Sequence, residues 1–239
     1  MHFSRLFVTL QAETDEVFMK KIFSVYVGAY VVWLVFVLGL LLAYPKVELH
    51  LMLNACHTDF QDTFFRYYSV LAEWPLYVLA LLPLLWKRRD IVLFYALSEL
   101  AAGGVVQILK HLFTAPRPVK VFENYPDLLL PLVDGVQLHH SNSFPSGHTS
   151  TFFVFFTCCA LMLAYYYAQG TRGKGRGTWM QAGCLQLLLL ALAALGGYSR
   201  IYLSQHFLSD VCVGSIIGII VPCMVFCFCR NRILKLHQE

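Results

Sequence analysis

The sequence has little charge for its length. Only 13% of its 239 residues are Asp, Glu, Lys or Arg, whereas 58% are hydrophobic and the mean hydropathy is +0.62. A typical soluble domain carries about 25% charged residues, and a disordered chain combines low hydrophobicity with high charge. The composition therefore excludes a disordered chain and argues strongly against a soluble domain. It fits a protein whose solvent is lipid.

The sequence also lacks any pattern that pairs its eight cysteines. Seven of them lie in or beside apolar runs, and Cys56 lies in a polar segment with no local partner. Because no CxxC pair has a matching second pair, we predict neither a disulfide framework nor a zinc site. Internal repeats and low-complexity tracts are missing too. We expect no metal and no cofactor, and the net charge of +4 gives no indication of a nucleic-acid partner.

What the sequence does have is long apolar runs. A helix that crosses a bilayer needs about 20 mainly apolar residues, and six stretches qualify. Their interiors contain only four charged residues, namely Glu73, Glu99, Lys110 and Asp210. We therefore predict an all-α fold, an integral-membrane bundle of six transmembrane helices in one domain, 1–239. The predicted spans are 22–44, 67–86, 91–113, 149–169, 178–198 and 207–229.

Basic residues orient this bundle, because loops on the cytoplasmic side carry an excess of Lys and Arg. With the N-terminus inside, twelve of the eighteen basic residues fall on the inner side. We therefore expect both termini in the cytoplasm, in a bacterial inner membrane, with the longer loops 45–66 and 114–148 facing the exterior. The short glycine-rich segment 170–177 is predicted to be an inner turn. The twelve are Arg5, Lys20, Lys21, Lys87, Arg88, Arg89, Arg172, Lys174, Arg176, Arg230, Arg232 and Lys235.

Three segments on the predicted outer face hold the informative polar residues, and each contributes to one kind of site. The first and third supply three cations, Lys110, Arg117 and Arg200. The arginine fork suits the oxygens of a phosphate, and lysine adds a compact positive charge. Three cations at one membrane face thus indicate a binding site for a tetrahedral oxyanion.

The second segment, Ser143 to His148, leads into the fourth predicted span. Pro145 suits the first position of a helix. The next backbone N–H groups, those of Ser146, Gly147 and His148, would then point at a bound anion, since a helix N-terminus is an anion site. Gly147 would let the backbone approach closely. This segment therefore completes a predicted phosphate pocket.

Two histidines indicate chemistry at that pocket. His206 and Asp210 lie four residues apart at the start of the sixth span, and such residues share one helix face. A carboxylate that holds one imidazole nitrogen leaves the other free, so His206 is the candidate nucleophile and Asp210 its orienting partner. His148, on another helix, is the candidate general acid. The pattern predicts metal-independent phosphoryl transfer.

These three segments closely resemble the motifs of the PAP2 family, the type 2 phosphatidic acid phosphatase superfamily. The family pattern K-x6-R-P matches Lys110 to Pro118, P-S-G-H matches Pro145 to His148, and S-R-x5-H-x3-D matches Ser199 to Asp210. The motif core is therefore 110–210, and no motif position departs from the pattern.

The resemblance implies a six-helix membrane bundle with its active site near the outer surface. It also implies that His206 forms a phosphohistidine supported by Asp210, that His148 protonates the leaving group, and that water hydrolyses the intermediate. No metal is required. By the same resemblance, the phosphate oxygens are held by Lys110, Arg117, Ser146, Gly147 and Arg200.

The leading hypothesis is a lipid phosphate or diphosphate phosphatase of the outer leaflet. Candidate substrates are undecaprenyl diphosphate, lipid A, phosphatidylglycerol phosphate and phosphatidic acid. A lipid-to-lipid phosphotransferase of the same fold would share every motif, so the sequence leaves both open. A transporter of an anion or lipid is the rival from another class, although no broken-helix pair or repeated polar face supports it. The oligomeric state stays open.

Three further features carry smaller predictions. Glu99 lies in mid-span and suggests either a polar contact within the bundle or a packed, protonated carboxyl group. Glu73, near the outer end of the second span, is a candidate to border the pocket. Gly214 and Gly218 form a GxxxG pair in the sixth span and predict close helix packing.

Overall fold

The computed structural model describes residues 2–170 and 176–233, with only the backbone for 2–15, 74–78, 80, 169–170, 176–178 and 230–233. All regular secondary structure in these ranges is helical, which confirms the predicted all-α class. The residues 171–175 of the predicted inner turn lie outside the described ranges. The helices are α1 (His2–Ala43), α2 (Lys46–Leu53), α3 (Asp59–Val70), α4 (Trp74–Lys87), α5 (Arg89–Phe113), α6 (Pro118–Phe122), α7 (Gly147–Gly170), α8 (Arg176–Tyr202) and α9 (Leu208–Ile233).

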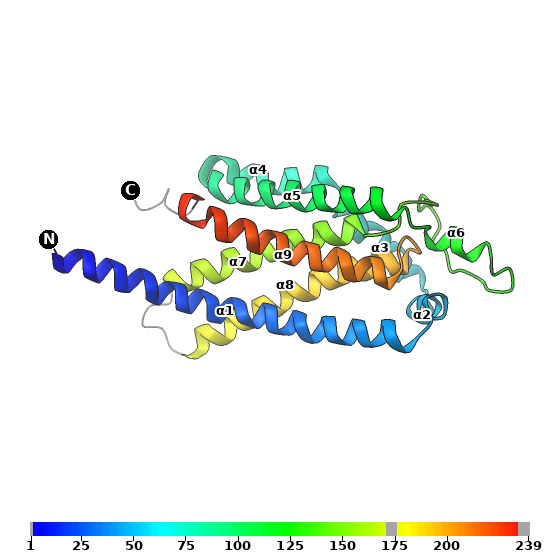
Figure 1. Ribbon diagram of the computed structural model, residues 1–239, viewed down its shortest axis with the longest axis horizontal. Helices are drawn as coiled ribbons and strands as arrows, with labels where there is room; N and C mark the ends of the chain where they lie inside the picture. Colours follow the sequence, from blue (N-terminus) through cyan, green and yellow to red (C-terminus); the bar gives the residue numbers. More distant parts are fainter. Residues whose placement is uncertain (1, 171–175, 234–239) are drawn as a thin grey trace.

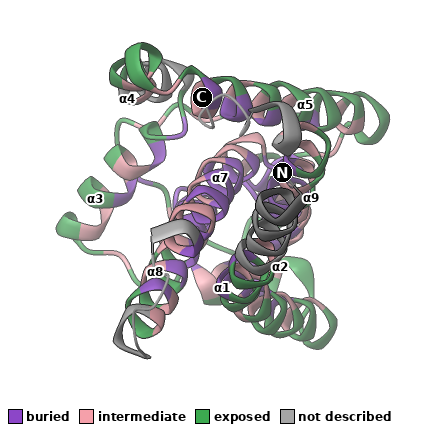
Figure 2. Cartoon of the chain, turned by 90° about the vertical axis from the view of Figure 1, so that its left-hand side faces the viewer, coloured by how far each residue is buried: buried purple, intermediate pink, exposed green. Residues whose placement is uncertain are grey.

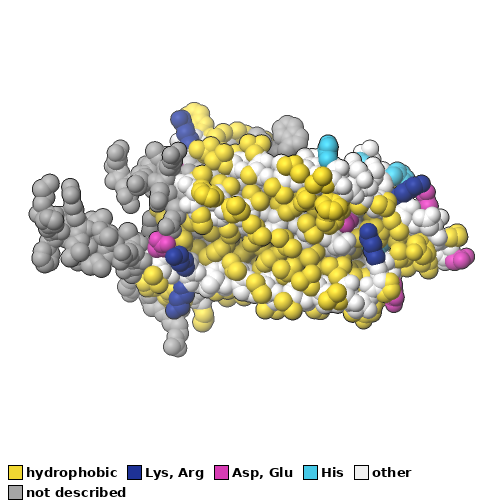
Figure 3. Space-filling model, viewed as in Figure 1, with side chains coloured by type: hydrophobic (Ala, Val, Ile, Leu, Met, Phe, Trp, Pro, Cys, Tyr) yellow, Lys and Arg dark blue, Asp and Glu magenta, His cyan; other side chains and the backbone are white. Residues whose placement is uncertain are grey.

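Five of the described helical segments are long and apolar enough to cross a membrane: Glu16–Ala43, Arg89–Phe122, Gly147–Ala168, Trp179–Tyr202 and Leu208–Cys229. They correspond to five of the six predicted spans, with ends shifted by up to nine residues. Hydrophobic side chains cover the middle of the molecule on the face in Figure 3, and most charged side chains visible there lie toward the two ends. The chain is therefore an integral membrane protein.

The predicted span 67–86 does not form one helix. The chain breaks between the end of α3 at Val70 and the start of α4 at Trp74, where a proline occupies one of the first two helical positions. Proline has no N–H to donate to a preceding turn, so it favours the start of a helix over its interior. The 14 residues of α4 rise only about 21 Å, short of the about 30 Å of a hydrocarbon core. The described residues thus form five of the six predicted spans as long helices, and the shorter helix α4 covers most of the sixth.

Helix α7 lies at the centre of the bundle and packs against α9, α8, α5 and α1. Its described residues are largely buried, whereas most described residues of α4 and many of those of α1 and α5 are exposed (Figure 2). Helix α9 comes close to α7 at Gly214 and Gly218. A Cβ atom on Gly214 would lie 2.6 Å from the carbonyl oxygen of Ser146, and one on Gly218 would lie 2.4 Å from Cβ of Phe153. The predicted close packing at the GxxxG pair is confirmed.

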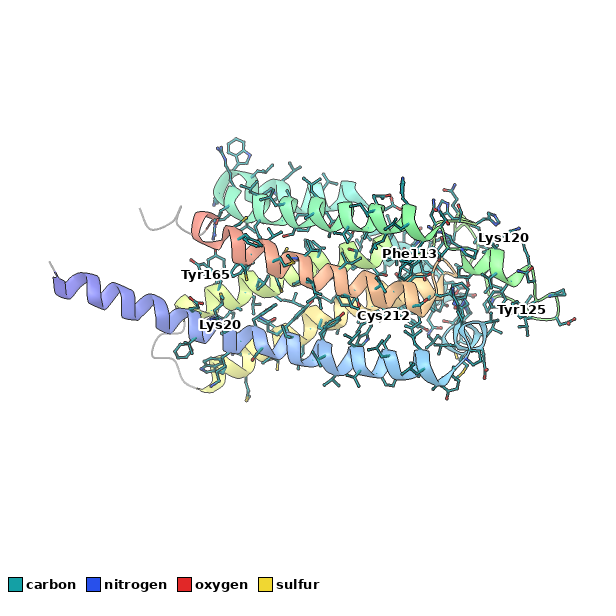
Figure 4. The ribbon with its side chains drawn as sticks, in the orientation of Figure 1. Lys20, Phe113, Lys120, Tyr125, Tyr165 and Cys212 are labelled. Atoms are coloured by element: carbon teal, nitrogen blue, oxygen red, sulfur yellow. The ribbon has the colours of Figure 1, made fainter. Side chains whose placement is uncertain are left out.

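The two ends of the bundle differ in construction. The short helices α2, α3 and α6 and the α8–α9 loop gather at one end, which we call the site end (Figure 1). Phe113 and Lys120 lie there, whereas Lys20 and Tyr165 lie toward the opposite end (Figure 4). The opposite end holds the short connection between α4 and α5 (Figure 1). Polar loops are thus concentrated at the site end.

Candidate active site

His206 lies in the short loop between α8 and α9, not on a helix. The loop folds back on the end of α8, since the N–H groups of Gln205 and His206 both donate to the carbonyl oxygen of Arg200, at 2.9 and 3.1 Å. Ser204 turns the chain with a positive φ of 51°, which is uncommon for a residue other than glycine. His206 is 1% exposed. The loop therefore buries the candidate nucleophile inside the site end.

A buried hydrogen-bond cluster holds this loop from the side of α2. Asn54 donates to Oγ of Ser204 at 2.8 Å, and Nε2 of His50 lies 3.4 Å from the same oxygen. Ser204 in turn donates to the carbonyl oxygen of Pro131 at 2.8 Å. The ring of His50 packs edge-on against Phe207, with centroids 5.1 Å apart. The side chain of His50 is 2% exposed, so it belongs to the buried framework that holds the loop.

Asp210 lies in the first turn of α9, and its carboxylate accepts several hydrogen bonds. Oδ2 accepts from the hydroxyl of Ser143 at 2.5 Å and from the N–H of Phe207 at 3.0 Å, and Oδ1 accepts from Ser209 at 3.1 Å. Nδ1 of His206 lies 3.7 Å from Oδ2, which is beyond hydrogen-bond range. The two residues lie close together as predicted, but they do not share a helix face, because His206 lies in the loop before α9 begins at Leu208.

Helix α7 begins at Gly147, two residues later than expected from Pro145. Ser146 is the N-cap, because its Oγ accepts from the N–H of Thr149 at 3.3 Å in the usual capping geometry. The N–H of Ser146 donates to the carbonyl oxygen of Asp210 at 3.0 Å. It is therefore committed to the fold, in contrast to the prediction. The N–H groups of Gly147 and His148 belong to the first turn, which has no intrahelical acceptors.

Two of the three cations lie on either side of the end of α5. Lys110 is in the last turn of α5, and Arg117 is the N-cap residue of α6. Lys110 lies beside the start of α7, where a Cβ atom on Gly147 would be 3.9 Å from Nζ. Arg117 is 9% exposed. Its Nε donates to the carbonyl oxygen of Ser141 at 2.9 Å, and its Nη1 donates to Oε1 of Gln205 at 2.9 Å. Gln205 thus joins Arg117 to the loop that carries His206.

The third cation, Arg200, lies in the last turn of α8 and is 7% exposed. Its Nη1 donates to Oγ of Ser69 on α3, and its Nε has no hydrogen-bond partner in the described part of the chain. Among the described residues, no carboxylate lies within 4.0 Å of Lys110, Arg117 or Arg200. A buried cation with only neutral partners is costly, and an anion bound beside it would lower that cost.

The structure brings all the predicted site residues into one cluster. His148 lies within electrostatic range of Lys110, Arg117, Arg200 and His206. The contacts above connect the remaining three, since Gly147 lies beside Lys110, and Ser146 bonds to Asp210. The complete set is Lys110, Arg117, Ser146, Gly147, His148, Arg200, His206 and Asp210.

The environment of His206 favours the neutral imidazole. Burial lowers its pKa to about 4, and the positive charges of Arg200 and Arg117 act in the same direction, whereas Asp210 opposes them. A pKa this far below the ordinary histidine value leaves the ring uncharged at neutral pH. One ring nitrogen then carries a free lone pair, as a nucleophile requires.

Sequence reasoning missed Ser143, Gln205 and Ser69, which hold Asp210, Arg117 and Arg200. A lone serine or glutamine in a loop carries no spacing signal, so only the three-dimensional contact reveals it. Glu99 is partly buried and accepts from Thr151 of α7 at 2.6 Å, the polar contact within the bundle that was one of its two predictions. Glu73 is exposed at the N-cap of α4, within electrostatic range of Arg200.

Comparison with known proteins places this fold and site in a family. The model of the PAP2 superfamily matches residues 91–234, so the chain belongs to that superfamily. The crystal structure of Aquifex aeolicus LpxE superposes with a TM-score of 0.56 at 26% identity, over 77% of this chain and 96% of that one. The Bacitracin transport permease protein BcrC of Bacillus licheniformis is 28% identical, over 70% of this chain and 72% of its own length.

Two eukaryotic relatives match shorter stretches. Phospholipid phosphatase 2 of Rattus norvegicus is 37% identical over 36% of this chain, and Probable lipid phosphate phosphatase 4 of Arabidopsis thaliana is 31% identical over 57% of it. The chain spans 29% and 48% of the lengths of these two proteins. Together the comparisons confirm the predicted family, and the names of these two relatives agree with the predicted enzyme class, a PAP2-type phosphatase.

Proposed function

We propose that this protein removes phosphate from a lipid phosphate or diphosphate through a phosphohistidine on His206. The observation that carries the proposal is the set of cations around His206 that have neutral partners but no carboxylate among the described residues. Such a cluster is preorganised for the charge that spreads over phosphoryl oxygens in the transition state. Lys110, Arg117, Arg200 and the N–H groups of the first turn of α7 would hold those oxygens.

The proposed reaction has two steps. Nε2 of His206 donates its lone pair to phosphorus while the bond from phosphorus to the leaving oxygen breaks, and His148 gives a proton to that oxygen. Water then attacks phosphorus while the bond from phosphorus to Nε2 of His206 breaks, and His148 accepts a proton from the water. Inorganic phosphate leaves, and the lone pair returns to Nε2. Asp210 stabilises the positive charge that the imidazole of His206 acquires. No step draws on a metal.

A lipid substrate is supported by the position of the site and by the relatives. The site lies at the end of helices that suit a bilayer, and two relatives are named as phosphatases of phospholipids or lipid phosphates. We propose that α3 and α4 together supply the sixth crossing and that the site end faces the exterior. Helix α1 begins and α9 ends at the opposite end (Figure 1), so both termini would be cytoplasmic.

The test is phosphate release in detergent, with EDTA present, from lipid A, undecaprenyl diphosphate, phosphatidylglycerol phosphate and phosphatidic acid. We expect turnover by the wild type and a loss of at least about 10⁴-fold in His206→Ala. His111→Ala is the matched control, because His111 is exposed and, within the described part of the chain, its ring bonds to the carbonyl oxygen of Gln107 in its own helix. It should keep wild-type activity.

Other outcomes have distinct meanings. Phosphate transfer that requires an added acceptor lipid would favour the phosphotransferase. Retention of lipid phosphate with no turnover would favour binding or transport. Equal activity in His206→Ala would refute the nucleophile, and activity lost in EDTA and restored by a divalent cation would refute the metal-independent mechanism.

A further inference from the structure

Ser143 occupies a position between two members of the proposed catalytic machinery. It lies in the segment that leads into α7 and is fully buried. Its N–H donates to the carbonyl oxygen of Ala115 at 2.9 Å, which fixes the backbone. Its Oγ lies 2.5 Å from Oδ2 of Asp210 and 3.5 Å from Nδ1 of His206. The hydroxyl thus reaches both residues at once.

The direct contact between His206 and Asp210 is longer than either contact to Ser143. Nδ1 of His206 is 3.7 Å from Oδ2 of Asp210, outside hydrogen-bond range. A hydroxyl can donate one hydrogen bond and accept two. Ser143 can therefore donate to the carboxylate while it accepts from an N–H at Nδ1.

We infer that Ser143 is a positioning residue that bridges His206 to Asp210 and keeps the imidazole proton on Nδ1. The inference rests on the proposed function, because this tautomer leaves the lone pair of His206 on Nε2, where it attacks phosphorus. When the bond from Nε2 to phosphorus forms, the proton stays on Nδ1. The positive charge on the ring is then stabilised by Asp210 through the serine hydroxyl.

The kinetic test compares Ser143→Ala with Ser143→Thr, which keeps a hydroxyl. A hydrogen bond to a charged partner corresponds to a rate factor of about 10- to 100-fold. We expect Ser143→Ala to lose that factor in kcat, with KM changed less than about threefold. Ser143→Thr should recover most of the loss. The control is Ser215→Ala, which removes another buried hydroxyl, bonded to Cys212 and Tyr30 in the interior of the bundle.

A spectroscopic readout separates this inference from the proposed function. In ¹⁵N-histidine NMR, with the His206 signal assigned from His206→Asn, the wild type should show the proton on Nδ1 and Ser143→Ala a mixture of tautomers. If no phosphate is released but this difference is seen, the proposed function fails and the bridge stands. Unchanged kcat and tautomer in Ser143→Ala would overturn the bridge. So would an equal loss of activity in Ser215→Ala, since that would indicate general disruption.

Discussion

Both ends of the bundle carry basic side chains, but the burial and the partners of these side chains differ between the two ends. At the opposite end, Lys20 is 68% exposed and pairs with Glu16 at 2.9 Å. Arg88 makes two hydrogen bonds to Asp90, at 3.1 and 2.7 Å. At the site end, Arg117 and Arg200 are at least nine-tenths buried, and their described partners are carbonyl, amide and hydroxyl oxygens.

The difference shows what each set of charges is for. A paired or solvated cation costs the fold little and binds nothing further. A buried cation with neutral partners keeps its charge available, at a cost in stability that a bound anion would offset. Under the proposed function, the unliganded site end is less stable than it would be with paired charges, and bound phosphate offsets this cost.

The largest difference between the two ends is expected when one arginine is removed from each. We expect Arg200→Met to lower kcat/KM by about 10²- to 10³-fold with no loss of thermal stability. Arg88→Met should keep activity within about twofold but lower the free energy of unfolding by about 2 kcal/mol, because the buried Asp90 loses the two hydrogen bonds that Arg88 donates to it. Phosphate release and thermal unfolding in detergent check both variants. The opposite ranking would contradict the assignment of roles.

A carboxylate added to the site end should pair with one of its arginines, as carboxylates do at the opposite end. In Gln205→Glu, a carboxylate would take the place of the amide oxygen 2.9 Å from Nη1 of Arg117. The new ion pair competes with phosphate, so we expect inhibition by inorganic phosphate to weaken by about 10- to 100-fold. Gln205→Met controls for the lost amide and should weaken it less. Equal inhibition constants in the two variants would show that charge compensation at Arg117 is unimportant.

Glycine substitutions extend the comparison from charge to packing. Gly214→Ala, at the site end, would place Cβ 2.6 Å from the carbonyl oxygen of Ser146, so we expect destabilisation of about 1–3 kcal/mol and reduced activity. Gly183→Ala, in the opposite half, meets nothing within 4 Å and should gain up to about 1 kcal/mol from helix propensity. Unfolding in detergent measures both. Similar stabilities would mean that α7 and α9 can separate without cost.

The last prediction concerns the pH dependence of stability. The pKa of His206 is lowered to about 4 from an ordinary value of 6.5, so between these values the unfolded chain binds a proton that the folded protein does not. Stability should therefore fall as pH drops from 6.5 toward 4, by up to about 3 kcal/mol from this residue. His206→Asn should show a shallower decline between pH 7.5 and 5. Parallel curves would place the proton uptake at other residues.

Pattern alone located most of the machinery. The five long helices were predicted to within a few residues, except that α1 extends far beyond its predicted start, because apolar runs bounded by polar residues mark where a chain can enter lipid. The three motifs converge at one end because each predicted segment follows or precedes a span on the same side. The prediction missed the break between α3 and α4, because the second half of the segment 67–86 is apolar throughout. Its two prolines, Pro75 and Pro83, do not exclude a membrane helix, since such helices tolerate proline.

What the sequence by itself determined is the class of protein, the helices and the set of candidate site residues, because hydropathy and motif spacing are local properties of the chain. Only the tertiary structure decided how those residues are held. Ser143 donates a hydrogen bond to Asp210, 67 positions away in the sequence. The N–H of Ser146 donates to the backbone carbonyl oxygen of Asp210. Such pairings depend on where loops and helix ends come to rest when the bundle packs, and no spacing along one chain records that position.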